Sequence, residues 1–105
     1  MKYNYNRSEW IKVSYNNKLK RIFNPPKNLP ELIDVLKKRF PDIEQEMTQP
    51  NAYVALSYMD NDGDLIDVED SRELLEAYRY GQMITKSNVM KFHLTVQTRE
   101  RKNEI

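Results

Sequence analysis

The chain of 105 residues contains no cysteine, two glycines and one histidine. Without cysteine, a disulfide framework and thiolate chemistry are both excluded. Two glycines are too few for a phosphate-cradling loop of the usual kind. No apolar run approaches the roughly 18 residues that a membrane span requires, and the opening stretch MKYNYNRSE lacks the apolar core of a signal peptide. We therefore expect a cytoplasmic protein without a membrane span.

Charged and aromatic residues make up much of what is present, at 31% and 10% of the chain. Regular apolar patterns together with a mean hydropathy of −0.86 favour a folded domain with a heavily charged surface over disorder. We expect one domain at residues 9–98, between a frayed N-terminus (1–8) and a charged tail (99–105). The net charge of +1 argues against nucleic acid as a partner.

The charge is distributed very unevenly along the sequence. Eight acidic residues and a single basic one, Arg72, lie between Asp60 and Glu76, which gives this stretch a local charge of −7. Residues 1–39 carry ten Lys/Arg and three Asp/Glu, a local charge of +7. Like charges placed this close together cost free energy unless positive charge offsets them. An acidic segment without an obvious partner in its own chain suggests a partner in another molecule.

Apolar periodicity predicts five strands and two helices. The strands are expected at residues 10–15, 18–23, 52–59, 65–68 and 89–98, with a hairpin turn at Asn16-Asn17. A polar loop is expected at 42–51, with a further turn through Ile43 and Met47 as an open alternative. Asn28 should cap a helix that Pro41 stops, and a second helix with Leu74, Leu75 and Ala77 on its buried stripe should end at Gly81. The order β-β-α-β-β-α-β predicts an α+β fold, a mixed sheet packed against helices on the plan of the ubiquitin-like β-grasp.

Metal-binding and catalytic interpretations of the acidic stretch fail on spacing. An EF-hand loop needs oxygen ligands at positions 1, 3 and 5, glycine at 6 and glutamate at 12. Counted from Asp60, the first three ligands match, but position 6 is Leu65 and position 12 is Ser71. His93 falls on the polar side of a strand, where an ordinary surface role is expected. We therefore expect no metal, no cofactor and no catalytic residue.

Ordinary structural roles explain only part of the charge. Asp70 and Glu73 fit a capping box at the start of the second helix, and Glu76 fits its exposed face. Four further acids exceed what a turn needs: Asp60, Asp62, Asp64 and Asp67. The basic residues of the first two strands would, taken alone, predict no more than a basic strand face or protected sheet edges.

Taken together, these residues resemble the Phox and Bem-one (PB-one) interaction domain, from Trp10 to Thr98. The acidic OPCA-type motif of that family reads roughly aromatic-x-D-x-(D/E)-G-D, then apolar residues, then E-L-x-x-A. Residues 58–64 (YMDNDGD) and 73–77 (ELLEA) match it, although Asn61 stands where an acid is common. The family's basic signature is matched by Lys12 in the first strand and by Lys20-Arg21, before Ile22, in the second.

The resemblance implies a protein-protein interaction module, not an enzyme, that pairs front to back for scaffolding or signalling assembly. Its partner is another PB-one domain or a second copy of itself, in head-to-tail oligomers. The implied acidic face comprises Asp60, Asp62, Asp64, Asp67 and Glu73, and the implied basic face comprises Lys12, Lys20 and Arg21. Two alternatives remain open: a ubiquitin-like adaptor domain that binds through an apolar patch, and a regulatory domain whose basic face binds an anionic surface.

Overall fold

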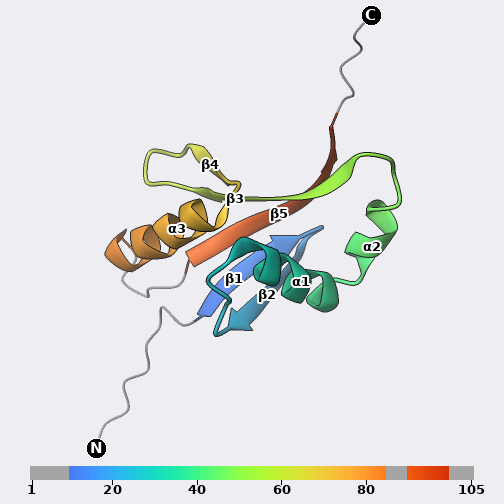
Figure 1. Ribbon diagram of the computed structural model, residues 1–105. Coiled ribbons are helices and arrows are strands. Elements are labelled where there is room, and N and C mark those ends of the chain that lie inside the picture. Colours follow the sequence, from blue (N-terminus) through green and yellow to red (C-terminus); the bar gives the residue numbers. More distant parts are fainter. Residues whose placement is uncertain (1–9, 85–89, 100–105) are drawn as a thin grey trace, which may run out of the picture.

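Five strands and three helices make up the computed structural model, which describes residues 10–84 and 90–99 (Figure 1). In order they are β1 (Trp10–Tyr15), β2 (Lys18–Phe23), α1 (Leu29–Arg39), α2 (Asp42–Glu46), β3 (Ala52–Met59), β4 (Leu65–Val68), α3 (Ser71–Ile84) and β5 (Met90–Thr98). The strands form one mixed sheet in the order β2-β1-β5-β3-β4. β1 and β5 run parallel, and the other neighbouring strands are antiparallel. The predicted α+β ubiquitin-like β-grasp is confirmed, with α2 as an additional helix.

The β1–β2 hairpin forms where the sequence predicts it. Asn16 and Asn17 both adopt positive φ, 51° and 66°, which asparagine tolerates better than most residues. The alternation along β1 buries Ile11 and Val13 and turns Lys12 to the opposite side, as predicted. That side of the sheet, away from the helices, is called the outer face below.

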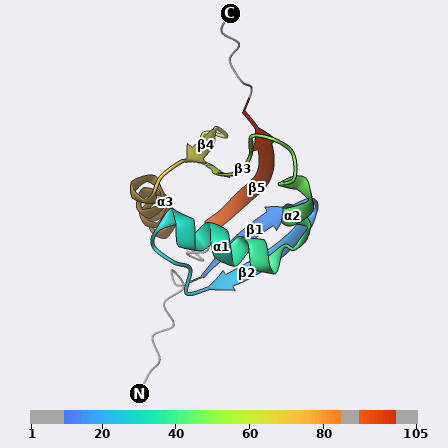
Figure 2. The same cartoon turned by 45° about the vertical axis from the view of Figure 1, so that its right-hand side comes forward.

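The helices pack on the other face of the sheet, where α1 crosses between α2 and α3 (Figure 2). The side chain of Asn28 caps α1 by accepting the backbone N–H of Glu31 at 2.9 Å. α1 buries Leu32 and Leu36. Ile43 of α2 is also fully buried, so the predicted polar loop contains a helical turn that delivers one apolar side chain to the core.

α3 begins with the predicted capping box. The carboxylate of Asp70 accepts the N–H of Glu73 at 2.8 Å. The carboxylate of Glu73 accepts the N–H of Glu69 at 2.7 Å, one residue before the donor that a capping box normally uses. Both acids are therefore used to satisfy backbone donors at the start of this helix.

Two predictions for the rest of α3 are wrong. Gly81 does not end the helix, which continues to Ile84. Gly81 is buried against Met90 of β5, so the close approach of helix and strand, rather than a helix end, explains the missing side chain. Leu75 is 37% exposed, whereas Leu74 and Ala77 are fully buried; the buried stripe of α3 is narrower than predicted.

Several predictions for the ends of the chain concern residues outside the described ranges: the frayed N-terminus (1–8), the start of the last strand at Val89, and residues 100–105 of the tail. Arg99 belongs to the predicted tail, yet its N–H donates to the carbonyl of Asn51 at 3.1 Å and so continues the β3–β5 ladder. In the part of the chain that the structure describes, no helix has the length and apolar character needed to cross a membrane.

Candidate interaction surfaces

The turn between β3 and β4, residues Asp60–Asp64, is here called the acidic turn. One carboxylate oxygen of Asp60 accepts the N–H groups of both Asp62 and Asp64, each at 2.9 Å. Gly63 adopts φ +85°, which a residue with a side chain rarely does. Carboxylate oxygens of Asp60, Asp62 and Asp64 all lie within 4.8 Å of one another. Asp60 thus organises the turn, while Asp62 and Asp64 remain exposed.

Tyr80 of α3 holds the acidic turn against the helix. Its hydroxyl accepts the N–H of Asn61 at 2.7 Å and donates to the side-chain oxygen of Asn61 at 2.6 Å. Sequence reasoning missed Tyr80. The one available signal was its spacing of seven residues from Glu73, which places both side chains on the same face of a helix.

Acids from the turn and from α3 act electrostatically on one hydroxyl, that of Tyr58. Burial raises its pKa above the ordinary value, and the Tyr80 hydroxyl and the carboxylates of Asp60, Glu76 and Glu73 raise it further. These carboxylates therefore share one negative region. Glu76, assigned from the sequence only to an exposed helix face, adds to it.

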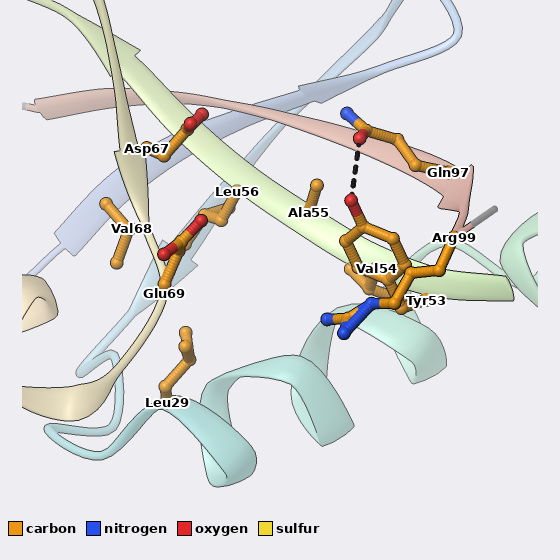
Figure 3. A pocket seen from close by; sticks show the side chains of 10 residues that line it. All are labelled: Leu29, Tyr53, Val54, Ala55, Leu56, Asp67, Val68, Glu69, Gln97 and Arg99. Carbon is orange, nitrogen blue, oxygen red and sulfur yellow. Dashed lines mark hydrogen bonds between the residues drawn. The ribbon is translucent and has the colours of Figure 1, made fainter. Parts of the chain in front are cut away.

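Asp67 lies apart from the acidic turn. It lines a cavity of about 570 Å³ at the point where β4 ends, beyond which β3 stays paired with β5 but has no strand on its β4 side (Figure 3). In this cavity the guanidinium of Arg99 stands 4.3 Å from the ring centre of Tyr53, whose hydroxyl donates to Gln97 at 2.9 Å. The residues that line the cavity include no histidine, serine or threonine, so they offer no hydroxyl nucleophile with a histidine base.

Lys12, Arg21 and Lys91 form a group of cations on the outer face, here called the cationic cluster. Lys12 lies opposite Arg21 in the β1–β2 ladder and opposite Lys91 in the β1–β5 ladder. The guanidinium of Arg21 stacks over the ring of Trp10, 4.4 Å from its centre. Lys91 was not predicted, because the register between β1 and β5 joins residues far apart in the sequence.

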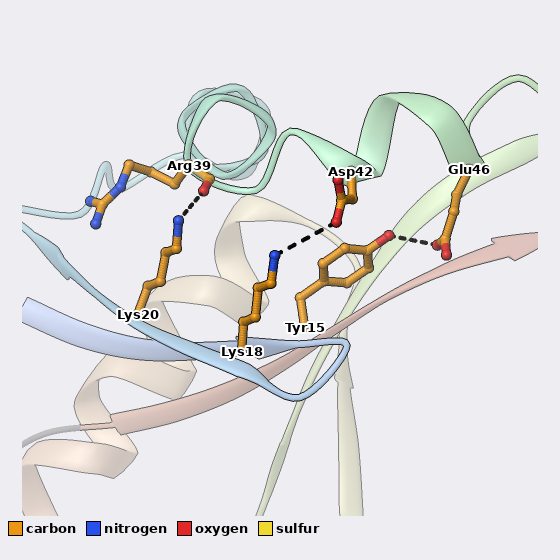
Figure 4. Close-up of polar contacts among 6 residues, drawn as sticks. All are labelled: Tyr15, Lys18, Lys20, Arg39, Asp42 and Glu46. Atoms are coloured by element: carbon orange, nitrogen blue, oxygen red, sulfur yellow. Dashed lines mark hydrogen bonds and ion pairs between the residues drawn. The ribbon is translucent and has the colours of Figure 1, made fainter.

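Lys20 lies on the opposite face from Lys12 and Arg21. It is opposite Val13 in the ladder and faces the helices. Its Nζ donates to the carbonyl of Arg39 at 2.6 Å (Figure 4). The same Nζ lies 5.2 Å from the ring centre of Phe40. A cation at this position satisfies a free carbonyl at the C-terminus of α1 and complements the helix dipole. The structure therefore brings together two of the three predicted basic residues.

Neither charged surface is neutralised within the described ranges 10–84 and 90–99. The ion pair found there joins Lys18 and Asp42, with a distance of 3.7 Å between Nζ and Oδ2, and involves neither surface (Figure 4). The acidic turn follows β3 and precedes β4 at one edge of the sheet, whereas the cationic cluster spans β2, β1 and β5. Each molecule thus presents two separate surfaces of opposite charge.

The family described as the PB1 domain matches residues 8–97. No curated protein matches the sequence. Among solved structures, a cryo-EM structure of an AtNBR1-PB1 filament (L-type) is 22% identical, with 84% of this chain and 96% of that chain covered and a TM-score of 0.60. The AtNBR1-PB1 domain is also 22% identical, with 85% and 94% covered and a TM-score of 0.49. The protein belongs to the PB1 (Phox and Bem-one) domain family, a family of interaction domains.

Proposed function

We propose that the protein joins PB1 domains head to tail. The acidic turn of one copy binds the cationic cluster of the next copy, or of a related PB1 domain. The observation that carries this proposal is the presence of two surfaces of opposite charge at separate parts of one sheet, neither of them in an ion pair within residues 10–84 and 90–99. Such a contact suits scaffolding or signalling assembly.

Some of the proposed residues contact the partner, and the others stabilise the local structure of this protein. Asp62 and Asp64 meet the partner's cations, and Asp60 shapes the turn through its two N–H bonds. Glu73 acts mainly by capping α3, and Asp67 lies at the edge of the contact. On the basic side, the cationic cluster makes the contact, and Lys20 supports α1 instead.

The charges set how strongly such a contact depends on salt. An exposed ion pair contributes about 0–1 kcal/mol, so useful affinity requires several pairs that act together. Screening acts over about 10 Å at 0.1 M salt, and all of these charges lie near the surface. Association should therefore weaken markedly between low and high salt.

The geometry also determines the kind of assembly. A contact between two different surfaces of the same molecule is heterologous, and it either propagates into open chains or closes into a ring. The AtNBR1 PB1 domain, whose solved structure is similar to this fold, forms a filament. We infer the same capacity for this protein.

Sedimentation velocity over a range of protein and salt concentrations tests the proposal. Wild type should form a concentration-dependent ladder of species at low salt. The variant Lys12→Ala/Arg21→Ala lacks two of the three cations of the cationic cluster, and the variant Asp62→Ala/Asp64→Ala lacks the two exposed carboxylates of the acidic turn. Each variant should be monomeric. A one-to-one mixture of the two should give a heterodimer that grows no further, because its outer surfaces are inactive.

A matched control removes two exposed cations elsewhere, in the variant Lys27→Ala/Lys38→Ala, and should assemble like wild type. All of these variants should keep wild-type stability within about 0.5 kcal/mol, because the side chains lie at the surface. If the Lys12→Ala/Arg21→Ala variant still forms the ladder, the basic surface is not where we place it. Association that salt leaves unchanged or strengthens would instead favour an adaptor that binds through an apolar patch.

A further inference from the structure

An exposed apolar pair flanks each of the two charged surfaces. Met59 and Leu65 lie opposite each other in the β3–β4 ladder, directly before and after the acidic turn. They are 53% and 57% exposed. Trp10 and Phe23 lie opposite each other in the β1–β2 ladder, one step along the outer face from the Lys12–Arg21 pair, and Phe23 is 66% exposed.

The Trp10–Phe23 pair is a preformed platform. The two ring centres lie 5.7 Å apart, and Trp10 carries the guanidinium of Arg21 on its face. Side chains on one face of a strand repeat about every 6.8 Å, so the platform adjoins the cations directly. A partner that reaches the cationic cluster at this end must also cover or adjoin the exposed ring of Phe23.

We propose that the head-to-tail contact has an apolar half, in which Met59 and Leu65 of one copy pack on Trp10 and Phe23 of the next. This inference rests on the proposed function, and the occupant of the platform is a second copy of this chain. In both surfaces the apolar pair adjoins the charges: the pair and the acidic turn are consecutive in sequence, and the platform is one ladder step from Lys12. Docking of the charges therefore brings the apolar pairs within reach of each other.

The chemistry of the two pairs is complementary. A thioether makes favourable contacts with aromatic rings, and a leucine side chain on a ring removes apolar surface from water. This half of the contact is not screened by salt. It would also confer specificity, because a partner without apolar residues at these positions could supply only the charged half of the contact.

A double-mutant cycle on the one-to-one heterodimer tests the apolar contact. The acidic partner is the Lys12→Ala/Arg21→Ala variant with or without Leu65→Ser, and the basic partner is the Asp62→Ala/Asp64→Ala variant with or without Phe23→Ser. Isothermal titration calorimetry should show that each serine substitution weakens binding about tenfold, or about 1.4 kcal/mol. Combined, they should weaken it far less than about a hundredfold, because each removes the same contact.

Leu19→Ser in the basic partner is the matched control. Leu19 is 54% exposed on the same strand and face as Phe23, on the other side of Arg21, and its replacement should leave the Kd unchanged. Thermal melts should show that all partners remain folded.

The charged contact and the apolar contact fail in different ways. If the acidic and basic partners do not bind even at low salt, the proposed function is wrong and the apolar contact falls with it. If they bind in a salt-dependent manner but Phe23→Ser and Leu65→Ser leave the Kd within about twofold, the charged contact stands and the apolar contact is wrong. If the double substitution weakens binding about a hundredfold, which is the product of the two single effects, Phe23 and Leu65 do not touch.

Discussion

Replacing Gly81 by alanine should destabilise the domain, although alanine is the better helix former. In a helix interior the change from glycine to alanine normally gains about 1 kcal/mol. Here the new Cβ would lie 2.8 Å from Sδ and 3.2 Å from Cβ of Met90. The thioether can rotate away, but the Cβ of Met90 is fixed to β5, so α3 and β5 must move apart. Overpacking of this kind costs about 1–3 kcal/mol, which leaves a net loss of about 1 kcal/mol.

Urea denaturation followed by circular dichroism measures this loss. The midpoint should fall while the slope stays constant, and the melting temperature should drop by about 4–8 °C for each kcal/mol. The Met90→Gly variant removes Sδ, Cγ and Cβ, the three atoms of Met90 that the new methyl group would meet. In that background Gly81→Ala should become neutral or stabilising by up to about 1 kcal/mol.

The reversal of sign is the decisive result. Arg79→Ala, at an exposed position of the same helix, is the control and should change stability by less than about 0.5 kcal/mol. If Gly81→Ala is as stable as wild type or more stable in the presence of Met90, the close packing of α3 on β5 does not explain this glycine.

Further predictions concern the charged surfaces, calcium and pH. Asn61→Asp should tighten heterodimer binding severalfold in low-salt calorimetry, because it adds a carboxylate to the acidic turn and keeps an acceptor for the tyrosine hydroxyl of α3. Lys20→Met should lower the free energy of unfolding by about 0.5–1 kcal/mol but leave heterodimer affinity unchanged, as calorimetry would show. Calcium titration should give no saturable micromolar shifts of the amides of Asp60–Asp64, because the EF-hand spacing is absent. Burial, and then a hydrogen bond to a carboxylate of α2, raises the pKa of Tyr15 from 10.0 to about 12. At pH values between 10.0 and about 12, the folded state thus keeps the Tyr15 proton that the unfolded chain releases. The free energy of unfolding, measured in urea, should therefore fall as the pH rises through this range, and it should fall less steeply in Tyr15→Phe.

Local patterns predicted much of the fold correctly. The positive-φ turn at Asn16-Asn17, the cap at Asn28 and the capping box at Asp70 each depend on residues within a few positions of one another. The alternation of β2 also favours the buried side for Lys20, two residues before Ile22, whereas the family signature groups Lys20 with Lys12. The structure follows the alternation and separates these two lysines.

Contacts between distant residues could not be read from local patterns. Lys91 joins Lys12 through the register of β5 against β1, and Tyr80 reaches back 19 residues to the acidic turn. Gly81 carried the usual signal of a helix end, which the packing of α3 against β5 overrides. In each case the deciding partner lies on another element of the fold.

The separation of the acidic turn from the cationic cluster gives polarity to any chain built by the proposed contact. One end of such an assembly would present carboxylates, and the other end would present cations. Growth at the two ends therefore uses different surfaces of the incoming molecule. A copy with only one working surface would add once and then block that end. The length of the assembly would therefore follow the ratio of blocking to propagating copies, and not affinity alone.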